Sequence, residues 1–279
     1  MSSIFTAPVY KLEKLNNIFI ELTEKNCNYR CKSCYIKFND IGFSNKTVKD
    51  FIPIEKIKEA LTHTKNEDLH CIYFTGAEPM THPDFNNILR LCLKRTNVCI
   101  CTNGSFLNEK KIRFLNKVES ESNHQIFFKL SLTHFDELEN DKSKYRGNFR
   151  QTIFALKTLS RYNFNSCLTI QNYYKLEEKL LTEMFNKILT ENEISNIELQ
   201  IVNSYPNFTD ESFTKQAKKT DCMFSRTLTK NGIFSCPFLS NDYRGRLGTN
   251  FENYSKNITA ETDFCATCSN NNDFIFTIS

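Results

Sequence analysis

The chain of 279 residues has no tryptophan, no internal repeat, no low-complexity segment and no run of eighteen apolar residues. The missing apolar run argues against a membrane-spanning helix. The first residues, MSSIFTAPVY, have neither a basic segment nor a long apolar stretch, so we expect no signal peptide. The net charge of +4 is small and charges of both signs are interspersed, so we expect neither a nucleic-acid nor a membrane partner.

Cysteine, by contrast, is abundant, with 12 residues. Without a secretion signal, this number indicates a reducing compartment, in which thiols bind metals rather than pair as disulfides. We therefore expect a cytoplasmic protein, sensitive to oxygen if its thiols hold a metal centre. The length suffices for one large domain, or for one domain with a small appendage, and the 40% hydrophobic content suffices for a sizeable core.

Short apolar runs alternate with stretches of helical periodicity up to about Val202. The expected strands are residues 18–22, 71–75, 98–101, 126–131, 167–171 and 197–202, and the expected helices are residues 53–63, 83–93, 108–118, 149–159 and 175–191. Such alternation predicts an α/β fold with a parallel sheet and helical crossovers. Six units fall short of a full (β/α)8 barrel, so we expect a partial (β/α)6 TIM-like barrel over residues 1–205.

Alternate residues of each expected strand share one face. Glu21, Lys129 and Glu198 lie in the middle of strands that are otherwise largely apolar. Buried charges need a partner or a cavity, so we expect these three side chains to point into the barrel, toward a substrate or toward an internal partner. The alternative is that some of these strands lie at an edge of the sheet with one face in water.

The sequence changes character after residue 205. Turn residues in NSYPNFTD end the alternation, and the following stretch is rich in expected loops. We expect residues 206–279 to form a small second unit. It contains four cysteines whose spacing alone fits zinc as well as an iron–sulfur cluster: Cys222, Cys236, Cys265 and Cys268.

The densest group of cysteines follows the first expected strand. Cys27, Cys31 and Cys34 form a CxxxCxxC pattern, and no histidine lies nearby. A closed tetrahedral zinc site takes four such ligands, so three thiols are one short. A four-iron cluster held by three thiolates keeps one iron open for another ligand. Zinc, or three buried thiols without a metal, are the alternatives.

This CxxxCxxC loop in a β/α chain resembles the loop of the radical S-adenosylmethionine (SAM) enzymes. In that family, three thiolates hold a [4Fe–4S] cluster whose open iron is chelated by the amino and carboxylate groups of SAM. Reduction of the cluster cleaves SAM to a 5′-deoxyadenosyl radical. The family usually has an aromatic residue before the third cysteine, where this chain has Ser33; the resemblance assigns part of that contact with adenine to Tyr35.

Three further motifs follow in the order that the resemblance implies. Gly76-Ala77-Glu78 is similar to the family's Gly-Gly-Glu loop, which binds the methionine amino group. Thr102-Asn103-Gly104 is similar to a Thr-Asn-Gly motif, although Asn-Gly is also an ordinary turn pair. Ser131 and Arg146 are similar to the pair that holds the methionine carboxylate, and a guanidinium suits a carboxylate through paired hydrogen bonds.

The four C-terminal cysteines follow a segment that resembles the radical SAM core. In this context they resemble the ligands of the auxiliary-cluster extension called SPASM, or twitch in its short form: Cys222, Cys236, Cys265 and Cys268. Four thiols suffice for one fully ligated [4Fe–4S] cluster, so the resemblance implies the short form. Zinc, or a cluster that uses only three of these thiols, remains the alternative. In the three-ligand case, the remaining thiol would serve as a hydrogen donor.

The resemblance implies an enzyme that takes a hydrogen from a substrate carbon, with oxidation, epimerisation or crosslinking of a ribosomal peptide as the expected reaction. Dehydrogenation of a sugar or cyclitol-like metabolite is the alternative, and no segment before the first strand is long enough for a separate peptide-recognition domain. A reducing partner such as flavodoxin or ferredoxin is also implied. The alternative from another class is a zinc-binding or redox-sensing module without enzymatic activity.

The remaining thiols fall inside expected strands and helices, where cysteine is usually a small buried hydrophobe. They are Cys71, Cys92, Cys99, Cys101 and Cys167. Cys167 shares a strand face with Thr169 and Gln171, and that face is the one expected to line the barrel. It is therefore the one thiol of this group that we consider as a catalytic candidate.

Overall fold

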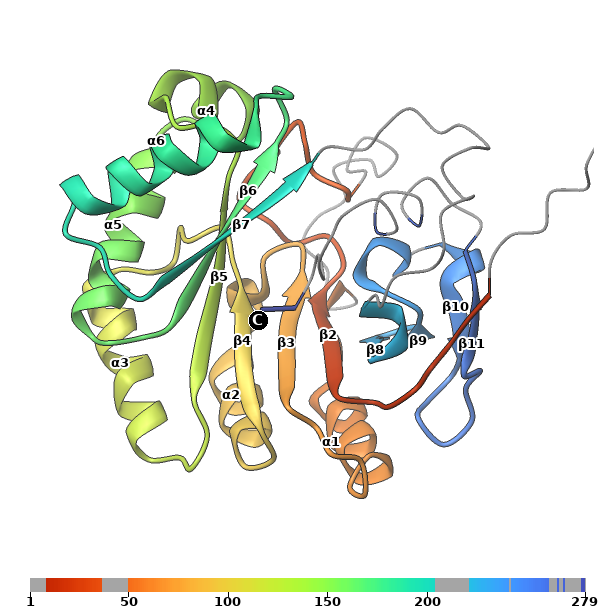
Figure 1. Cartoon of the computed structure of the whole chain (residues 1–279). Coiled ribbons are helices and arrows are strands. Elements are labelled where there is room, and N and C mark those ends of the chain that lie inside the picture. Colours follow the sequence, from red (N-terminus) through yellow and green to blue (C-terminus); the bar gives the residue numbers. More distant parts are fainter. Residues whose placement is uncertain are drawn as a thin grey trace, which may run out of the picture.

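The computed structural model describes residues 9–36, 50–203, 221–240, 242–260, 265, 268, 277 and 278. Within these residues, a 9-stranded sheet has the order β10-β9-β8-β2-β3-β4-β5-β6-β7. A separate 2-stranded antiparallel sheet pairs β1 (Val9–Lys11) with β11 (Asn257–Thr259). Figure 1 shows the large sheet crossing the molecule, with the second sheet at its β10 side.

From β2 to β7, the order along the sheet follows the order along the chain, and every neighbouring pair is parallel. The strands are β2 (Asn17–Thr23), β3 (Cys71–Gly76), β4 (Asn97–Cys101), β5 (Ile126–Leu132), β6 (Ser166–Asn172) and β7 (Ile197–Asn203). The helices between them are α1 (Ile54–His63), α2 (Phe85–Leu93), α3 (Glu109–Ser120), α4 (Glu137–Ser143), α5 (Asn148–Arg161) and α6 (Glu178–Glu191).

Each of the six expected strands matches an observed strand to within one residue at either end, so the prediction of a parallel α/β fold is confirmed. Helix α4 is missing from the sequence-based expectation. Its sequence, ELENDKS, has one apolar residue and therefore no hydrophobic periodicity to detect. Its start is instead fixed by Asp136, whose side chain accepts a hydrogen bond from the Glu139 backbone N–H at 3.0 Å.

Three strands from the segment after residue 205 extend the same sheet. Strand β8 (Ser225–Thr229) pairs in parallel with β2, and the antiparallel strands β9 (Gly232–Phe234) and β10 (Arg246–Gly248) follow it. The expected boundary at residue 205 therefore does not coincide with an edge of the sheet. The closure of a partial barrel and a separate twitch unit remain predictions.

The two faces of the sheet differ in chemistry. Ile18, Ile20 and Leu22 of β2 belong to the large apolar cluster that the helices complete. Phe19 and Tyr73 belong to a smaller cluster on the opposite face, where their rings stack at 4.8 Å between centroids. The small cluster also contains three thiols and a residue near the chain end: Cys71, Cys99, Cys101 and Ile278.

The chain end lies on the face of the sheet away from the helices, in front of β3 and β4 (Figure 1). The Ile278 backbone N–H donates to the Tyr73 hydroxyl at 3.3 Å. The Thr277 hydroxyl donates to Asp221 Oδ1 at 2.9 Å, and Lys129 Nζ lies 3.4 Å from the Thr277 carbonyl oxygen. The last residues of the chain thus cover part of the face on which the sequence predicts a substrate.

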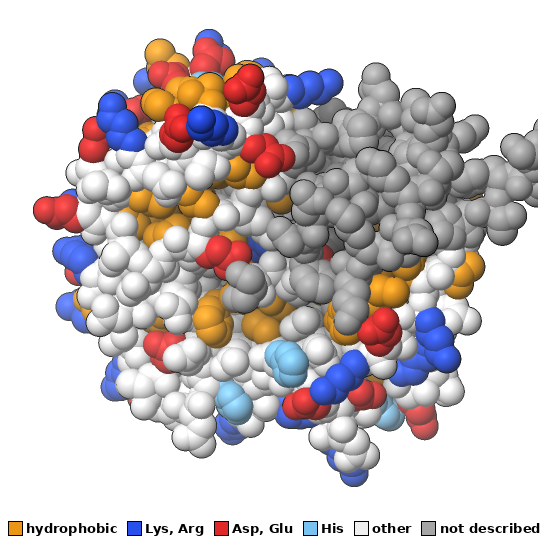
Figure 2. Space-filling view, viewed as in Figure 1, with side chains coloured by type: hydrophobic (Ala, Val, Ile, Leu, Met, Phe, Trp, Pro, Cys, Tyr) orange, Lys and Arg blue, Asp and Glu red, His pale blue; other side chains and the backbone are white. Residues whose placement is uncertain are grey.

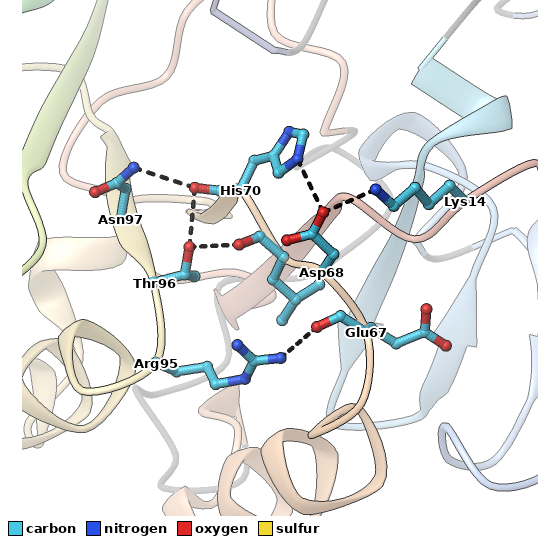
Figure 3. Close-up of polar contacts among 8 residues, drawn as sticks. Lys14, Glu67, Asp68, His70, Arg95, Thr96 and Asn97 are labelled. Carbon is cyan, nitrogen blue, oxygen red and sulfur yellow. Dashed lines mark hydrogen bonds and ion pairs between the residues drawn. The ribbon is translucent and has the colours of Figure 1, made fainter.

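A polar network joins the amino ends of β3 and β4 (Figure 3). The Thr96 hydroxyl donates to the Leu69 carbonyl at 2.8 Å and lies 2.9 Å from that of His70. Arg95 donates to the Glu67 carbonyl at 2.5 Å. These bonds satisfy loop carbonyls and fix the register of the two strands, at the edge of the sheet opposite the CxxxCxxC loop.

Lys, Arg, Asp and Glu side chains are intermingled on the face of the molecule shown in Figure 2. This mixing agrees with the interspersed charges of the sequence. None of the helices in the described part of the chain is long and apolar enough to cross a membrane.

Candidate active site

The loop after β2 brings Cys27, Cys31 and Cys34 to the carboxyl end of the sheet, and all three are half-buried free thiols. Burial, together with the nearby charges of Glu78, Cys31 and Cys34, raises the pKa of Cys27 to about 11. Burial likewise raises the pKa of Cys34. Three thiolates this close together repel one another, so the loop favours a bound cation or metal centre that offsets their charge.

Backbone and side-chain bonds hold this loop against distant elements. Gln171 of β6 donates to the Ser33 carbonyl at 2.9 Å. The Lys32 backbone N–H donates to the carbonyl of Ser143, the last residue of α4, at 2.7 Å. The Tyr29 ring stacks on Tyr145 with 4.7 Å between centroids. The thiols are therefore positioned by tertiary contacts as well as by their spacing.

Two N–H groups point at the sulfur atom of Cys27. The Tyr29 backbone N–H donates to Cys27 Sγ at 3.3 Å, and Asn103 Nδ2 lies 3.6 Å from the same sulfur. Donors aimed at a sulfur favour its thiolate form, which is the form that binds iron.

Among the described residues, no group of three Cys, His, Asp or Glu side chains converges on a point where a single metal ion would bind. A four-iron cluster makes a different demand, because each thiolate binds a different corner of a cube. Its ligands surround a volume rather than share a point. The donor set fits such a cluster: three half-buried thiols in one loop, with N–H donors directed at a sulfur and the Ser33 hydroxyl buried without a partner among the described residues.

The loop after β3 passes directly beside the end of β2. Gly76 has φ +115°, and a Cβ atom built on it would lie 2.3 Å from the Thr23 carbonyl oxygen. The Ala77 backbone N–H donates to that same oxygen at 2.9 Å, and the Glu78 backbone N–H donates to the Asn26 carbonyl at 2.9 Å. This close approach requires glycine at position 76, whereas position 77 accepts alanine.

Glu78 is fully buried and joins two of the expected motifs. Its carboxylate accepts hydrogen bonds from Thr102 Oγ1 at 2.8 Å, from the Asn103 backbone N–H at 2.9 Å and from the Met80 backbone N–H at 3.1 Å. Burial nevertheless raises the pKa of Glu78 to about 7. A carboxylate has about four acceptor positions, so one remains for a further donor.

Asn103 connects this carboxylate to the cysteine loop. Its backbone N–H binds Glu78, and its side chain donates to Asn28 Oδ1 at 2.9 Å and approaches Cys27 Sγ. The Thr-Asn-Gly turn therefore has a clear structural role, which the sequence left open beside a role in cofactor binding. Its contact with the cofactor remains a prediction.

The predicted pair Ser131 and Arg146 is not brought together. Arg146 is exposed and forms no side-chain hydrogen bond or ion pair within the described residues. Lys144 instead donates to Ser131 Oγ at 2.7 Å. Burial raises the pKa of Cys34, and the charge of Lys144 opposes that rise. The cation beside Ser131 is thus Lys144, and the contact of Arg146 with a methionine carboxylate remains a prediction.

Tyr35, the residue after the third cysteine, packs edge-on against Phe238 with 5.1 Å between ring centroids. Burial raises its pKa well above the usual value, and a hydrogen bond with the Thr75 side chain opposes that rise. Phe238 belongs to the segment that the sequence separates from the barrel. The predicted contact of Tyr35 with adenine remains a prediction.

Four cysteines from the C-terminal segment also gather, from three separate stretches of the chain. Cys236 is buried, and the charges of Cys222 and Cys265 add to the rise that burial causes in its pKa. The pKa of Cys268 is also raised by burial first, then by the charges of Cys222 and Cys236. The folded chain thus brings these thiols within electrostatic reach of one another, although among the described residues no three of them converge on a single-metal position. What they bind remains a prediction.

The face of the sheet away from the helices holds a row of polar side chains. Cys101, Lys129, Cys167 and Glu198 are successive partners across β4, β5, β6 and β7. Lys129 Nζ donates to Gln200 Oε1 at 2.5 Å, so these two side chains share that face, as strand parity predicts. Glu198 is half-buried on β7, the last strand of the sheet in the described residues, which agrees with the edge-strand alternative.

Glu21 lies at the border between this face and the C-terminal segment. It is 4% exposed and accepts a hydrogen bond from the Ser240 hydroxyl at 2.5 Å. Burial raises the pKa of Glu21 to about 7. Its partner is therefore an internal hydroxyl group of the C-terminal segment.

Comparison with known proteins now identifies the class. Residues 24–186, more than half of the chain, match the family model described as the radical SAM superfamily. The chain therefore belongs to the radical SAM superfamily. Membership supports an enzyme that binds SAM and implies a [4Fe–4S] cluster.

One curated relative is the S-adenosylmethionine-dependent nucleotide dehydratase RSAD2 of Oncorhynchus mykiss. It is 33% identical over 92 residues, which make up 31% of this chain and 24% of the relative. The match spans about a quarter of that protein, so it is a local similarity.

Solved structures with a similar fold include SuiB of Streptococcus suis bound to S-adenosylmethionine, with a TM-score of 0.62 and 15% identity over 86% of this chain and 64% of that one. A second is anSMEcpe with bound AdoMet, with a TM-score of 0.64 and 14% identity over 86% of this chain and 76% of that one. At these identities the likeness concerns the fold alone.

Several residues of the site have little or no signal in the sequence. Lys144 lies two residues before Arg146 in the sequence. The conformation of the α4–α5 connection determines that Lys144, and not Arg146, points toward Ser131. Gln171 supports the cysteine loop from β6, and the only signal was its position on the inner face of that strand. The contact of Thr277 with Lys129 joins residues far apart in the chain and has no local pattern.

Proposed function

We propose that this chain uses SAM to generate a radical that takes a hydrogen atom from a substrate carbon. The observation that supports it is the joined arrangement at the carboxyl edge of the sheet, where Asn103 links the buried carboxylate of Glu78 to the sulfur of Cys27. Cys27, Cys31 and Cys34 would hold a [4Fe–4S] cluster, which, once reduced, would supply the electron for cleavage of SAM to a 5′-deoxyadenosyl radical and methionine.

The residues around the cysteine loop suit the two charged ends of a methionine group. Glu78 offers an unused acceptor position to the ammonium, and Gly76 lets the backbone approach it closely. Lys144 and Ser131 together offer an ammonium and a hydroxyl to the carboxylate. Glu78, in the loop after β3, would bind the ammonium of the methionine group, and Lys144, between α4 and α5, would bind its carboxylate. The two contacts together would fix the orientation of SAM.

The substrate would lie on the face of the sheet away from the helices, where Lys129, Gln200 and Cys167 are found. We favour a ribosomal peptide that is oxidised, epimerised or crosslinked. In support, the fold resembles that of anSMEcpe, for which a complex with AdoMet and the Cp18Cys peptide is known. Flavodoxin or ferredoxin, in a cytoplasmic setting, would supply the electron.

A small polar metabolite, such as a sugar, a cyclitol or a nucleotide, is the second candidate. The specific observation in its favour is the local similarity to a nucleotide dehydratase, 33% identical over 92 residues. Lys129 suits this candidate too, because an ammonium on the inner face can pair with an anionic group of a small substrate.

We also propose that Cys222, Cys236, Cys265 and Cys268 bind a second [4Fe–4S] cluster, in an auxiliary domain of the twitch type. The mutual electrostatic influence of these thiols supports it, as does the burial of Cys236, which disfavours a free thiolate at that position. Such a centre would accept the electron left on the substrate after hydrogen abstraction. Structural zinc on the same four thiols is the alternative; it would require them to move closer together, because among the described residues no three converge on one metal position.

Anaerobic reconstitution tests the proposal. We expect about eight irons per chain for two four-iron clusters and about four if only the first forms. With SAM and dithionite, the reconstituted protein should form 5′-deoxyadenosine. Bound zinc at the first site, or iron at that site without any 5′-deoxyadenosine, would overturn the radical function. A peptide and a metabolite are then distinguished by which of them increases 5′-deoxyadenosine formation and is itself converted, seen as a change in mass or, for epimerisation, as uptake of deuterium from D2O.

A further inference from the structure

Arg226 is the largest fully buried side chain within the described residues, with 0% of its surface exposed. It lies in β8, between β2 and β9, in the sequence SRTLT. Arginine is almost never fully buried unless it has an anionic partner, because removing the guanidinium from water costs several kcal/mol. Its position in an inner strand therefore needs an explanation.

The immediate partners of Arg226 are backbone carbonyls. Its guanidinium donates to the carbonyls of Cys222 and Ser225, both at 2.6 Å, and to that of Lys256 at 2.7 Å. Its Nε atom is buried without a hydrogen-bond partner in the described part of the chain. No Asp or Glu forms an ion pair with it among these residues. Carbonyl dipoles satisfy hydrogen bonds, but they do not neutralise a full charge.

The ionisable groups that face Arg226 are Cys222, Cys236 and Tyr254. None of them is negatively charged while it keeps its proton. Metal binding changes this, because bound cysteines are thiolates and four thiolates give a four-iron cluster or a zinc ion a net negative charge. A buried cation beside Cys222 and Cys236, two of the four thiols, is the complement of such a centre.

We propose that Arg226 is the internal counter-ion of an anionic metal–thiolate centre formed by Cys222, Cys236, Cys265 and Cys268. This role rests on the second centre put forward above and adds a specific residue to it. The bond from Arg226 to the Cys222 carbonyl also orients the backbone of one ligand. Charge and hydrogen bonding around a cluster set its reduction potential.

Two consequences follow from electrostatics. A buried cation stabilises the more negative, reduced state of a nearby cluster, so its loss lowers the reduction potential. It also couples metal binding to folding: with metal bound, Arg226 is paired, and without metal, it is an uncompensated charge. Replacing Arg226 by methionine should therefore destabilise the metal-loaded protein more than the metal-free protein.

The experiment uses the full-length chain with Cys27, Cys31 and Cys34 replaced by alanine, so that only the C-terminal centre forms. Parent, Arg226→Met and Arg226→Lys are loaded anaerobically with iron and sulfide, and iron, sulfide and zinc are counted. An electrochemical titration followed by electron paramagnetic resonance then gives the midpoint potential. Arg244→Met is the control, because Arg244 lies in the same segment but is paired with Asp242 at the surface.

We expect Arg226→Met to change the ratio of oxidised to reduced cluster at a fixed potential by about tenfold, equivalent to about 59 mV downward for a one-electron couple. Arg226→Lys should retain most of the parent potential because it keeps the charge. The difference in Tm between metal-loaded and metal-free protein should shrink for Arg226→Met and stay unchanged for Arg244→Met.

An unchanged potential together with an unchanged Tm difference in a loaded Arg226→Met protein would overturn the counter-ion role and leave the second cluster standing. If the parent binds zinc and no iron or sulfide, the second cluster fails, and the Tm difference with zinc still decides the role of Arg226. If the parent binds neither metal at these thiols, both proposals fail. If Arg226→Met does not fold, the Arg226→Lys protein decides: loss of loading despite its retained charge would overturn the role.

Discussion

The two groups of cysteines solve the same electrostatic problem in opposite ways. Cys27, Cys31 and Cys34 lie in one loop, half-buried at the edge of the sheet, and a cation near them, Lys144, is on a neighbouring connection. The C-terminal thiols come from three separate stretches; Cys236 is buried, the other three are half-buried, and the cation that binds the Cys222 carbonyl is Arg226, which no solvent reaches. An accessible cation can bind a ligand, whereas an enclosed one can only balance a charge.

The difference teaches which group can do chemistry on a bound molecule. The first group has three thiols, the buried carboxylate of Glu78 with an unused acceptor position, and Lys144 hydrogen-bonded to Ser131. This group is therefore incomplete without a ligand. The second has four thiols and a buried cation, so the metal centre that we propose there would need no further ligand. The contact between Tyr35 and Phe238 joins the segments that carry the two groups.

Removal of a first-group thiol is the most severe way to break the comparison. Cys27→Ala should abolish formation of 5′-deoxyadenosine from SAM and dithionite, because the cluster loses one of its three ligands. Cys222→Ala should leave that cleavage detectable while it stops turnover of the substrate. Cys92→Ala is the control, since Cys92 is buried in α2 away from both groups, and it should behave like the parent. Equal loss in the Cys27 and Cys222 variants would contradict the division of roles.

The next test concerns the glycine beside the first group. Gly76→Ala should lower the free energy of unfolding by about 3 kcal/mol or more, because a Cβ cannot coexist with the Thr23 carbonyl. Gly147→Ala is a matched control: its φ is also positive, +82°, but nothing lies within 4 Å of the added Cβ, so the cost should be about 1 kcal/mol. Thermal unfolding measures both, and equal costs would refute the close-approach argument.

Lys144 and Arg146 offer a sharper comparison within the first group. Lys144→Ala should weaken SAM binding by about 2 kcal/mol, or roughly 30-fold, because a charge-assisted contact to the carboxylate is lost. Arg146→Ala should change SAM affinity by less than about twofold, since its side chain is exposed. Equilibrium binding of SAM to the reconstituted protein measures both. The opposite ranking would restore Arg146 to the role that the sequence suggested.

The last test concerns Glu21, at the border between the two groups, where the effect depends on pH. Burial raises the pKa of Glu21 to about 7 from 4.5, so the folded protein holds this proton more tightly than the unfolded chain. The stability that Glu21 contributes is full below about pH 4.5 and is lost as the pH rises through 7. Glu21→Gln should therefore raise the free energy of unfolding by about 2 kcal/mol at about pH 8.5 and change it little near pH 5. Denaturant unfolding at the two pH values measures this, and an equal benefit at both would show that the carboxyl group does not titrate in this way.

The sequence predicted the sheet well because its signals are local. Apolar runs and helical periodicity located six parallel strands to within one residue at either end. The CxxxCxxC spacing and the loop after β3 were equally visible, since a thiol cluster and a required glycine leave short patterns. Strands β8, β9 and β10 were not predicted. In β8, for example, Arg226 and three threonine or serine residues give a sequence that does not resemble a buried strand.

Local patterns in the sequence were enough to predict the parallel sheet, the first group of thiols and the family to which the chain belongs. The contact of Lys144 with Ser131, the pairing of β8 with β2 and the buried guanidinium near Cys222 became visible in the folded chain alone. The difference arises because the two kinds of signal act over different distances along the chain. Periodicity and ligand spacing act over a few residues, whereas the pairing of charges and the burial of polar groups depend on which distant segments the folded chain brings together.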